Sequence, residues 1–222
     1  MVTLQVDDQA IEAAEGTSLL RACLDNGIYI PNLCQMEGQA HPTAACRLCF
    51  VAIEGLAKPV TSCTVRVARG LVVRTDTEAV RRLQRSALRL LLSVHHVDCG
   101  HCPANKRCDL QKIARFLKVG LKPKGLERYL KQPEVISVHP LIDYYPNRCV
   151  LCGKCVQTCK NSQGQPLLAF ARRGFDTIIS AFGAPQADPP DCSSCLACID
   201  ICPVAAILVR KDVCQPSAVS NG

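Results

Sequence analysis

The chain opens with alternating apolar and polar residues. Positions 2–6 alternate, positions 7–9 have the composition of a turn, and positions 10–13 suit a returning strand. This pattern predicts a β-hairpin at the N-terminus. The apolar segments FVAIEG at 50–55 and LVVRTDT at 71–77 predict further strands.

A short helix is expected directly after the hairpin. Apolar residues recur between positions 19 and 24, and either Thr17 or Ser18 can cap the start of the helix. The dipeptide at 26–27, Asn-Gly, is a typical helix stop.

Two more helices are predicted in the middle of the chain. Thr75 and Glu78 have the spacing of a capping box, and apolar residues then recur at helical intervals over 80–94. A second apolar stripe over 110–117 stops near Gly120. The arginines of the longer helix fall mostly on its other faces, and we interpret them as a solvated or subunit-facing surface rather than an anion site: Arg81, Arg82, Arg85 and Arg89.

The last third of the chain predicts a strand at 135–139 and a pair of strands within 166–183. Three phenylalanines of the paired region are interpreted as packing residues and not as a platform for nucleic-acid bases: Phe170, Phe175 and Phe182.

Composition limits what these elements can bury. The 222 residues include no Trp, only 4% aromatic residues and 17 Cys. Small domains that bury little apolar surface need additional cross-links, and metal clusters can supply them. A stable fold is therefore not expected without metal.

Disulfides are the competing use of so many cysteines, but they belong to secreted chains. The N-terminus has neither the basic nor the apolar region of a secretory signal, and no apolar run reaches membrane-spanning length. We expect a soluble protein of a reducing compartment, the cytoplasm.

The formal charge of +7 counts cysteine as neutral, whereas cluster ligands are thiolates. Four oxidised clusters would contribute about −7, which would leave the holo-protein near neutral. The basic balance is thus interpreted as compensation for buried anions, and no binding to nucleic acid is expected.

Two four-cysteine runs in the last domain carry the strongest chemical signal. Each has the spacing C-x2-C-x2-C-x3-C by which bacterial ferredoxins hold two 4Fe-4S clusters, with the fourth cysteine of each run crossing to the other cluster. Pro203 after the second run fits this pattern, and Lys160 after the first departs from it. The expected ligand sets are Cys149, Cys152, Cys155 and Cys202 for one cluster, and Cys159, Cys192, Cys195 and Cys198 for the other.

Four further cysteines follow the N-terminal helix. Their spacing, C-x11-C-x2-C-x13-C, has a longer first gap than in plant-type ferredoxins. The order of hairpin, helix and cysteine loop resembles the β-grasp ferredoxin domain. The long loop resembles the 2Fe-2S domain that opens the large iron-sulfur subunit of complex I and certain hydrogenases, which implies 2Fe-2S ligation by Cys34, Cys46, Cys49 and Cys63. Structural zinc is the alternative for all of these cysteines.

One histidine stands three residues before another cysteine run. The segment H-x3-C-x2-C-x5-C resembles a 4Fe-4S motif of the same two families, and the resemblance implies ligation by His95, Cys99, Cys102 and Cys108. Neither His96 nor His101 has this spacing, and neither is expected to be a ligand. Of the two remaining cysteines, Cys23 is interpreted as a core residue and Cys214 is given no role.

These motifs predict an α+β protein of three domains. They are a β-grasp 2Fe-2S ferredoxin domain at 1–77, a helical 4Fe-4S domain with one histidine and three cysteine ligands at 78–134, and a bacterial-type ferredoxin domain with two 4Fe-4S clusters at 135–212. A disordered tail is expected at 213–222.

The sequence contains no Gly-rich nucleotide loop and no catalytic triad order. We therefore expect no catalytic residues and no binding of NAD or FMN on this chain, only one 2Fe-2S and three 4Fe-4S clusters that relay electrons. A zinc-stabilised, non-redox binding module is the remote alternative.

The four ligand sets in this order resemble the small iron-sulfur subunit, called gamma, of the diaphorase module of NAD-reducing nickel-iron hydrogenases. The resemblance implies an FMN- and NAD-binding flavoprotein as one partner and the small and large subunits of the hydrogenase as others. It also implies a relay of single electrons between them, so that the whole complex couples dihydrogen oxidation to NAD reduction. An NAD-linked formate dehydrogenase or a multi-subunit iron-only hydrogenase is the alternative setting.

Overall fold

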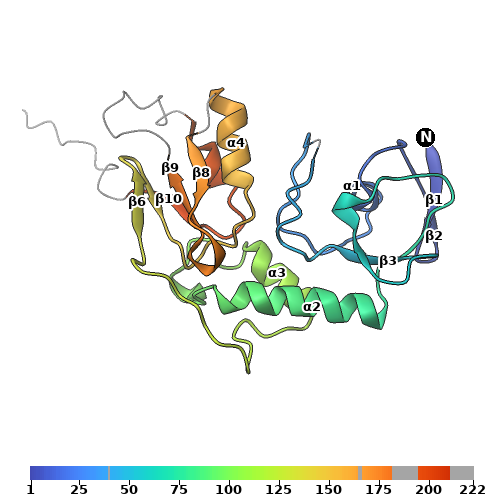
Figure 1. Cartoon of the computed structure of the whole chain (residues 1–222), viewed down its shortest axis with the longest axis horizontal. Coiled ribbons are helices and arrows are strands. Elements are labelled where there is room, and N and C mark those ends of the chain that lie inside the picture. Colours follow the sequence, from blue (N-terminus) through green and yellow to red (C-terminus); the bar gives the residue numbers. More distant parts are fainter. Residues whose placement is uncertain (40, 165–166, 182–194, 211–222) are drawn as a thin grey trace, which may run out of the picture.

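The computed structural model of the chain describes residues 1–39, 41–164, 167–181 and 195–210. The tail expected at 213–222 lies outside these residues. The molecule is elongated and of mixed α+β structure, with an N-terminal unit at one end and a C-terminal unit at the other (Figure 1). The helix α2, Glu78–Ser93, runs along one side and joins the two units (Figure 1).

The N-terminal unit is a mixed sheet with one short helix. Its strands are β1 (Val2–Val6), β2 (Gln9–Ala13), β3 (Phe50–Ile53), β4 (Val60–Thr61) and β5 (Val72–Arg74). They lie in the order β2-β1-β5-β3-β4, with β1 and β5 parallel and the other neighbours antiparallel. The expected hairpin is confirmed as β1–β2, while the two-residue β4 was too short to predict.

The helix α1, Leu19–Asp25, packs its apolar side into this unit. Ser18 is its N-cap, and the Ser18 hydroxyl accepts a hydrogen bond from the Arg21 N–H at 3.3 Å. The side chain of Cys23 is completely buried, which confirms its interpretation as a core residue.

The start of α2 differs from the prediction. Thr77, not Thr75, is the N-cap, and its hydroxyl accepts a hydrogen bond from the Val80 N–H. Thr75 instead donates from its N–H and its hydroxyl to the two carboxylate oxygens of Asp7, both at 2.8 Å. A tertiary contact with the first hairpin therefore displaces the expected cap by two residues.

The expected apolar stripe of α2 is confirmed in part. Of the residues that the pattern placed on the stripe, Val80 and Ala87 are buried, but Leu90 is 62% exposed. The pattern missed Leu88 and Leu92, which are also buried. The stripe also includes the fully buried Gln84, whose amide donates to the Phe50 carbonyl at 3.0 Å and so ties α2 to β3.

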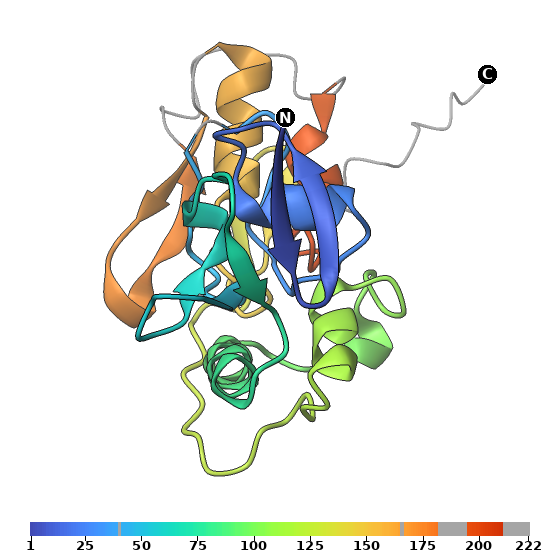
Figure 2. The same cartoon turned by 90° about the vertical axis from the view of Figure 1, so that its right-hand side faces the viewer.

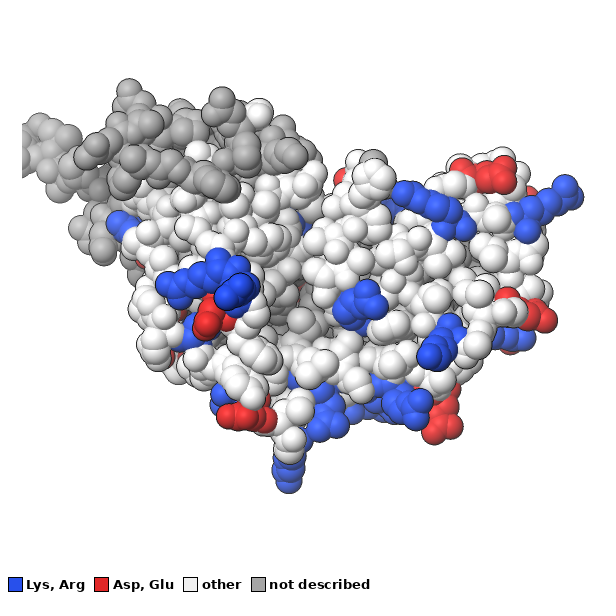
Figure 3. Space-filling model, in the orientation of Figure 1, with Lys and Arg blue, Asp and Glu red and all other residues white. Residues whose placement is uncertain are grey.

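Three arginines of α2 hold neighbouring segments. Arg81 lies over the ring of Phe116 in α3 (Asp109–Phe116), at 4.5 Å from its centroid. Arg85 donates to the Leu117 carbonyl and Arg89 to the Lys124 carbonyl. On the face shown in Figure 3, Lys and Arg side chains are spread over several separate places and do not form one continuous patch.

The C-terminal unit combines two small sheets with short helices. Its three-stranded sheet has the order β10-β7-β6, and β8–β9 form a separate antiparallel hairpin. The elements are β6 (Ile136–His139), β7 (Ile142–Tyr144), α4 (Lys154–Gln163), β8 (Leu168–Ala171), β9 (Ile178–Ala181), α6 (Ala197–Asp200) and β10 (Ile207–Val209). The strands expected at 135–139 and within 166–183 are thus confirmed as β6 and the β8–β9 hairpin.

Two buried apolar clusters fill the described part of the chain. One lies inside the N-terminal sheet and α1. The other extends from the helices α2 and α3 into the C-terminal unit, and it also takes in Leu33, Cys34, Cys46 and Leu48 from the N-terminal unit. The end-on view along α2 shows that the sheets of both units lie on the same side of this helix (Figure 2). In the described residues, no helix combines the length and apolar character needed to cross a bilayer.

Replacing Gln84 with Ala should lower the free energy of unfolding by about 1–3 kcal/mol, because the Phe50 carbonyl would lose its partner in a buried place. Urea denaturation of the holo-protein measures this loss. Leu90→Ala on the exposed side of the same helix is the control and should change stability by less than about 0.5 kcal/mol. Equal effects of the two substitutions would contradict the role given to Gln84.

Candidate metal centres

The first set of cysteines lies where the N-terminal unit meets the rest of the molecule. Cys34, Cys46, Cys49 and Cys63 are all buried. The sulfurs of Cys34 and Cys46 are 3.5 Å apart, close to the spacing of about 3.8 Å that two sulfurs take on one tetrahedral metal with bonds of about 2.3 Å.

The same four thiols form two pairs. A hydrogen bond from Cys46 lowers the pKa of Cys34 to about 6, and a hydrogen bond from Cys49 lowers the pKa of Cys63. Two pairs of thiolates are what two irons bridged by two sulfides require, since each iron takes two cysteines. The set fits a 2Fe-2S cluster, which the pairs Cys34 with Cys46 and Cys49 with Cys63 would hold.

The predicted histidine set also comes together. His95, Cys99, Cys102 and Cys108 line one pocket of about 380 Å³ of empty space, part of it open to solvent. His95 follows the C-terminal end of α2, Cys99 and Cys102 lie at a 3-10 turn, and Cys108 caps the start of α3. Burial raises the pKa of the Cys108 thiol, and the backbone N–H groups of Gln111 and Leu110 at the start of the helix oppose this rise.

The imidazole of His95 is oriented for metal binding. Its Nδ1 lies 3.0 Å from the carbonyl oxygen of Arg148. Because a carbonyl only accepts hydrogen bonds, the proton is on Nδ1 and the lone pair is on Nε2. Burial lowers the pKa of His95 to about 4, so the ring is neutral, as a metal ligand must be.

The other two histidines near this pocket are placed differently. The side chain of His101 is 87% exposed and pairs with Asp98 at 2.9 Å. His96 has an exposed side chain at the rim of the pocket, and its backbone N–H donates to the Asn147 carbonyl.

A second pocket collects one complete predicted ligand set of the C-terminal unit. Cys149, Cys152 and Cys155 from the first run line it together with Cys202 from the second. Cys159, the fourth cysteine of the first run, is buried in α4 and does not line this pocket. This is the arrangement that crossed ligation requires.

Backbone N–H groups point at the sulfurs of this set. The Leu151 N–H donates to the Cys149 sulfur at 3.4 Å, and the Ala206 N–H donates to the Cys202 sulfur at 3.2 Å. Between the ligands, Gly153 has a positive φ of 77°. A Cβ on Gly153 would meet the Phe170 ring and the Thr43 methyl group at 3.4 Å, an ordinary van der Waals contact, so it is the backbone conformation that favours glycine here.

The fourth predicted set is not complete in the described residues. Cys192 lies outside them, as do Phe182 and Cys214. Cys159 is buried, while Cys195 and Cys198 are half-buried beside and within α6. Of the phenylalanines expected to pack, Phe175 is 62% exposed and its ring stacks on that of Tyr129.

The histidine pocket and the Cys149 pocket share a wall. Val204 lines both of them. Two hydrogen bonds connect the surroundings of the two pockets. His95 donates to the Arg148 carbonyl, and the N–H of Asp109, the residue after Cys108, donates to the Pro203 carbonyl at 3.3 Å. Arg148 and Pro203 directly adjoin Cys149 and Cys202 in the chain.

The sulfurs of these pockets surround a space and do not meet at one point. Among the described residues, no three His, Cys, Asp or Glu side chains have the geometry to hold a single metal ion. A cubane binds each ligand at a different corner, so its ligands line a cavity. The predicted ligands of the histidine pocket and of the Cys149 pocket are arranged in this way.

Family models match three consecutive segments of the chain. A 2Fe-2S iron-sulfur cluster binding domain matches residues 1–78, the iron-sulfur binding region of NADH-ubiquinone oxidoreductase-G matches residues 84–121, and the ferredoxin-like domain of NADH-quinone oxidoreductase subunit 3 matches residues 139–208. The chain thus matches iron-sulfur domains over most of its length. It therefore has one 2Fe-2S domain followed by 4Fe-4S-binding domains.

Curated relatives of this chain are subunits of NAD(P)H-linked oxidoreductases. The chain is 35% identical over 210 residues to the NADPH-Fe(3+) oxidoreductase subunit alpha of Geobacter sulfurreducens, a match that covers 95% of this chain and 24% of the relative. It is 32% identical over 207 residues to the NADH-ubiquinone oxidoreductase 75 kDa subunit of Reclinomonas americana, covering 93% and 29%. The chain thus spans less than a third of the length of these relatives.

A solved structure shows the same fold over nearly the whole chain. A chain in the crystal structure of an NAD+-reducing nickel-iron hydrogenase in the H2-reduced state superposes with a TM-score of 0.81 and 26% sequence identity. The match covers 97% of this chain and 90% of that chain.

Sequence reasoning identified the cysteines but missed the groups around them. The residue type does not reveal these groups, which are the Arg148 carbonyl, the Val204 side chain and the backbone N–H donors to sulfur. Every residue has a carbonyl, nearly every residue has a backbone N–H, and valine occurs throughout protein cores. Asn147 could have been suspected, since it is a polar residue two positions before Cys149. Its side-chain amide accepts a hydrogen bond from the Lys131 N–H and donates one to the Lys131 carbonyl.

Replacing His95 with Cys should keep a 4Fe-4S cluster but lower its midpoint potential, on the order of 100 mV, because a thiolate adds negative charge to the cluster. A redox titration followed by EPR measures the shift. His101→Ala removes an exposed neighbouring histidine and should leave every potential unchanged. If His95→Cys left all potentials at their wild-type values, His95 would not be a ligand.

Proposed function

We propose that this chain is the iron-sulfur relay subunit of a cytoplasmic NAD-reducing hydrogenase complex. It carries single electrons between a nickel-iron hydrogenase module and a flavoprotein that binds FMN and NAD. The observation that carries the proposal is the pair of adjoining pockets, each lined by one complete predicted ligand set and separated by Val204. Clusters in two such pockets would be close enough to exchange electrons.

The ligands in this proposal are those expected from the sequence. Cys34, Cys46, Cys49 and Cys63 hold the 2Fe-2S cluster, and three 4Fe-4S clusters are held by His95 with Cys99, Cys102 and Cys108, by Cys149 with Cys152, Cys155 and Cys202, and by Cys159 with Cys192, Cys195 and Cys198. The domains that carry them are 1–77, 78–134 and 135–212.

The chain's own residues prepare these sites for electron transfer. Burial excludes water from most of the sulfurs, and backbone N–H groups directed at sulfur favour the more negative, reduced form of a cluster. The bound clusters supply the one-electron chemistry. The hydrogen bond between His95 and the Arg148 carbonyl joins a ligand of one cluster to the residue next to Cys149, a ligand of the other.

The extent of the structural match supports the hydrogenase setting. The superposition with the hydrogenase chain takes in 97% of this chain and 90% of that chain. With a TM-score of 0.81, the correspondence with the hydrogenase chain extends over all three proposed domains.

Anaerobically purified protein should contain about fourteen iron atoms per chain, two in one 2Fe-2S cluster and four in each of three cubanes. Iron and acid-labile sulfide analysis gives both numbers. A count of about ten irons would mean that one of the three proposed cubanes is absent. The ligand set that contains Cys192 would then be the first to test by mutation. Zinc without sulfide would overturn the relay function altogether.

The native complex, isolated through a tag on this chain, should contain nickel and FMN and should reduce NAD with dihydrogen. Metal analysis and the ultraviolet absorbance of the NADH formed provide the two readouts. A complex that contains molybdenum or tungsten and oxidises formate would place the same relay in a formate dehydrogenase instead.

A further inference from the structure

Tyr144 is the largest fully buried side chain near the Cys149 pocket. It lies at the end of β7, paired with Ile207 of β10, and none of its surface is exposed. Its hydroxyl oxygen is also buried and has no partner of regular hydrogen-bond geometry among the described residues. Burying a hydroxyl without a partner is unfavourable, so the position calls for an acceptor.

The Cys149 sulfur is the acceptor that the surroundings offer. Tyr144 and Cys149 belong to the same buried cluster, together with Cys152 and Cys155. Burial raises the pKa of the Cys149 thiol, and the Tyr144 hydroxyl opposes this rise as a donor to the sulfur. Ile207, the strand partner of Tyr144, lines the pocket that contains Cys149, so the pairing of β7 with β10 places the tyrosine at the wall of this pocket.

We propose that the Tyr144 hydroxyl donates a hydrogen bond to the Cys149 thiolate of a bound 4Fe-4S cluster and thereby raises the reduction potential of that cluster. The inference rests on the proposed ligation by Cys149, Cys152, Cys155 and Cys202. Tyr144 is a positioning residue in this scheme, because it acts through a ligand sulfur and touches no substrate. It would add a side-chain donor to the two backbone donors, Leu151 and Ala206, that already face this set.

The direction of the effect follows from charge. Reduction adds an electron to the cluster and makes its sulfurs better acceptors, so a hydrogen bond stabilises the reduced form more than the oxidised form. Loss of the Tyr144 hydroxyl should therefore favour the oxidised cluster. A tenfold change in the ratio of the two forms at a fixed potential corresponds to about 59 mV for one electron.

Tyr144→Phe in the full-length holo-protein tests this directly. The iron content should stay at the wild-type value, and an EPR-monitored titration should show one 4Fe-4S midpoint lowered by about 59 mV, a tenfold change, with the other midpoints unchanged. The midpoint potential that shifts in Tyr144→Phe should belong to a different cluster from the one whose potential shifts in His95→Cys.

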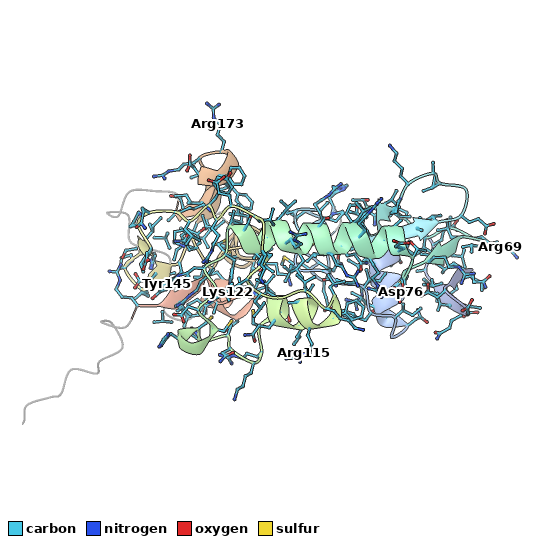
Figure 4. All side chains as sticks on the ribbon, turned by 90° about the horizontal axis from the view of Figure 1, so that it is seen from below. Arg69, Asp76, Arg115, Lys122, Tyr145 and Arg173 are labelled. Carbon is cyan, nitrogen blue, oxygen red and sulfur yellow. The ribbon has the colours of Figure 1, made fainter. Side chains whose placement is uncertain are left out.

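Tyr145→Phe is the matched control. Tyr145 is the next residue in the chain, is only partly buried, and lies with its ring under the Arg148 guanidinium at 4.2 Å (labelled in Figure 4). Removal of the Tyr145 hydroxyl should move no potential. An unchanged set of midpoints in Tyr144→Phe, with all clusters present, would overturn the role of Tyr144 and leave the relay function intact.

A second variant covers the case in which Tyr144→Phe loses its cluster. Site-specific 3-fluorotyrosine at position 144 keeps the ring and the hydroxyl but makes the hydroxyl a stronger donor, so the same midpoint should rise. No rise would count against the hydrogen bond. If wild-type protein contained no iron-sulfur cluster, the relay function itself would fail, a result that the iron analysis separates from the other two.

Discussion

The bond between metal and buried thiolate is the interaction on which this structure depends. Burial, with a further contribution from the neighbouring thiols of Cys149 and Cys202, raises the pKa of Cys152 to about 12, so without metal this thiol would stay protonated in the core. A bound iron would displace the proton and offset the charge that burial otherwise penalises. Because the proposed ligands come from distant parts of the chain, as Cys149 and Cys202 do, the free energy of metal binding would also stabilise the fold.

The elements that a local pattern specifies could be predicted from the sequence. The β1–β2 hairpin and the helices follow from periods of two and of 3.6 residues, and the spacing of the cysteines indicated which of them share a pocket. The predicted N-cap of α2 was wrong because of a residue that is distant in the sequence. Thr75 hydrogen-bonds to the carboxylate of Asp7, and Thr77 is the N-cap of α2 instead. The exposure of Leu90 has a related cause, since α2 is covered on one side only.

The surroundings of the ligands could not be predicted, and they determine how the sites behave. The partner of His95 is a carbonyl group 53 residues further along the chain, and Val204 separates two pockets only because β10 folds back beside β7. Such contacts depend on chain topology and not on residue type. The proposed ligands could thus be predicted from the sequence, whereas the surroundings that would set the properties of a bound cluster arise from the assembled fold.

The division of the first cysteine set between two cores has a further consequence. Cys34 and Cys46 belong to the central buried cluster, while Cys49 and Cys63 belong to the cluster inside the N-terminal sheet. A cluster bound by all four cysteines would therefore also cross-link two parts of the molecule. Its oxidative loss would remove one redox centre and would also weaken the contact between the N-terminal unit and the rest. Oxygen and water would then reach the neighbouring sulfurs, and the loss of one cluster would expose the others to damage.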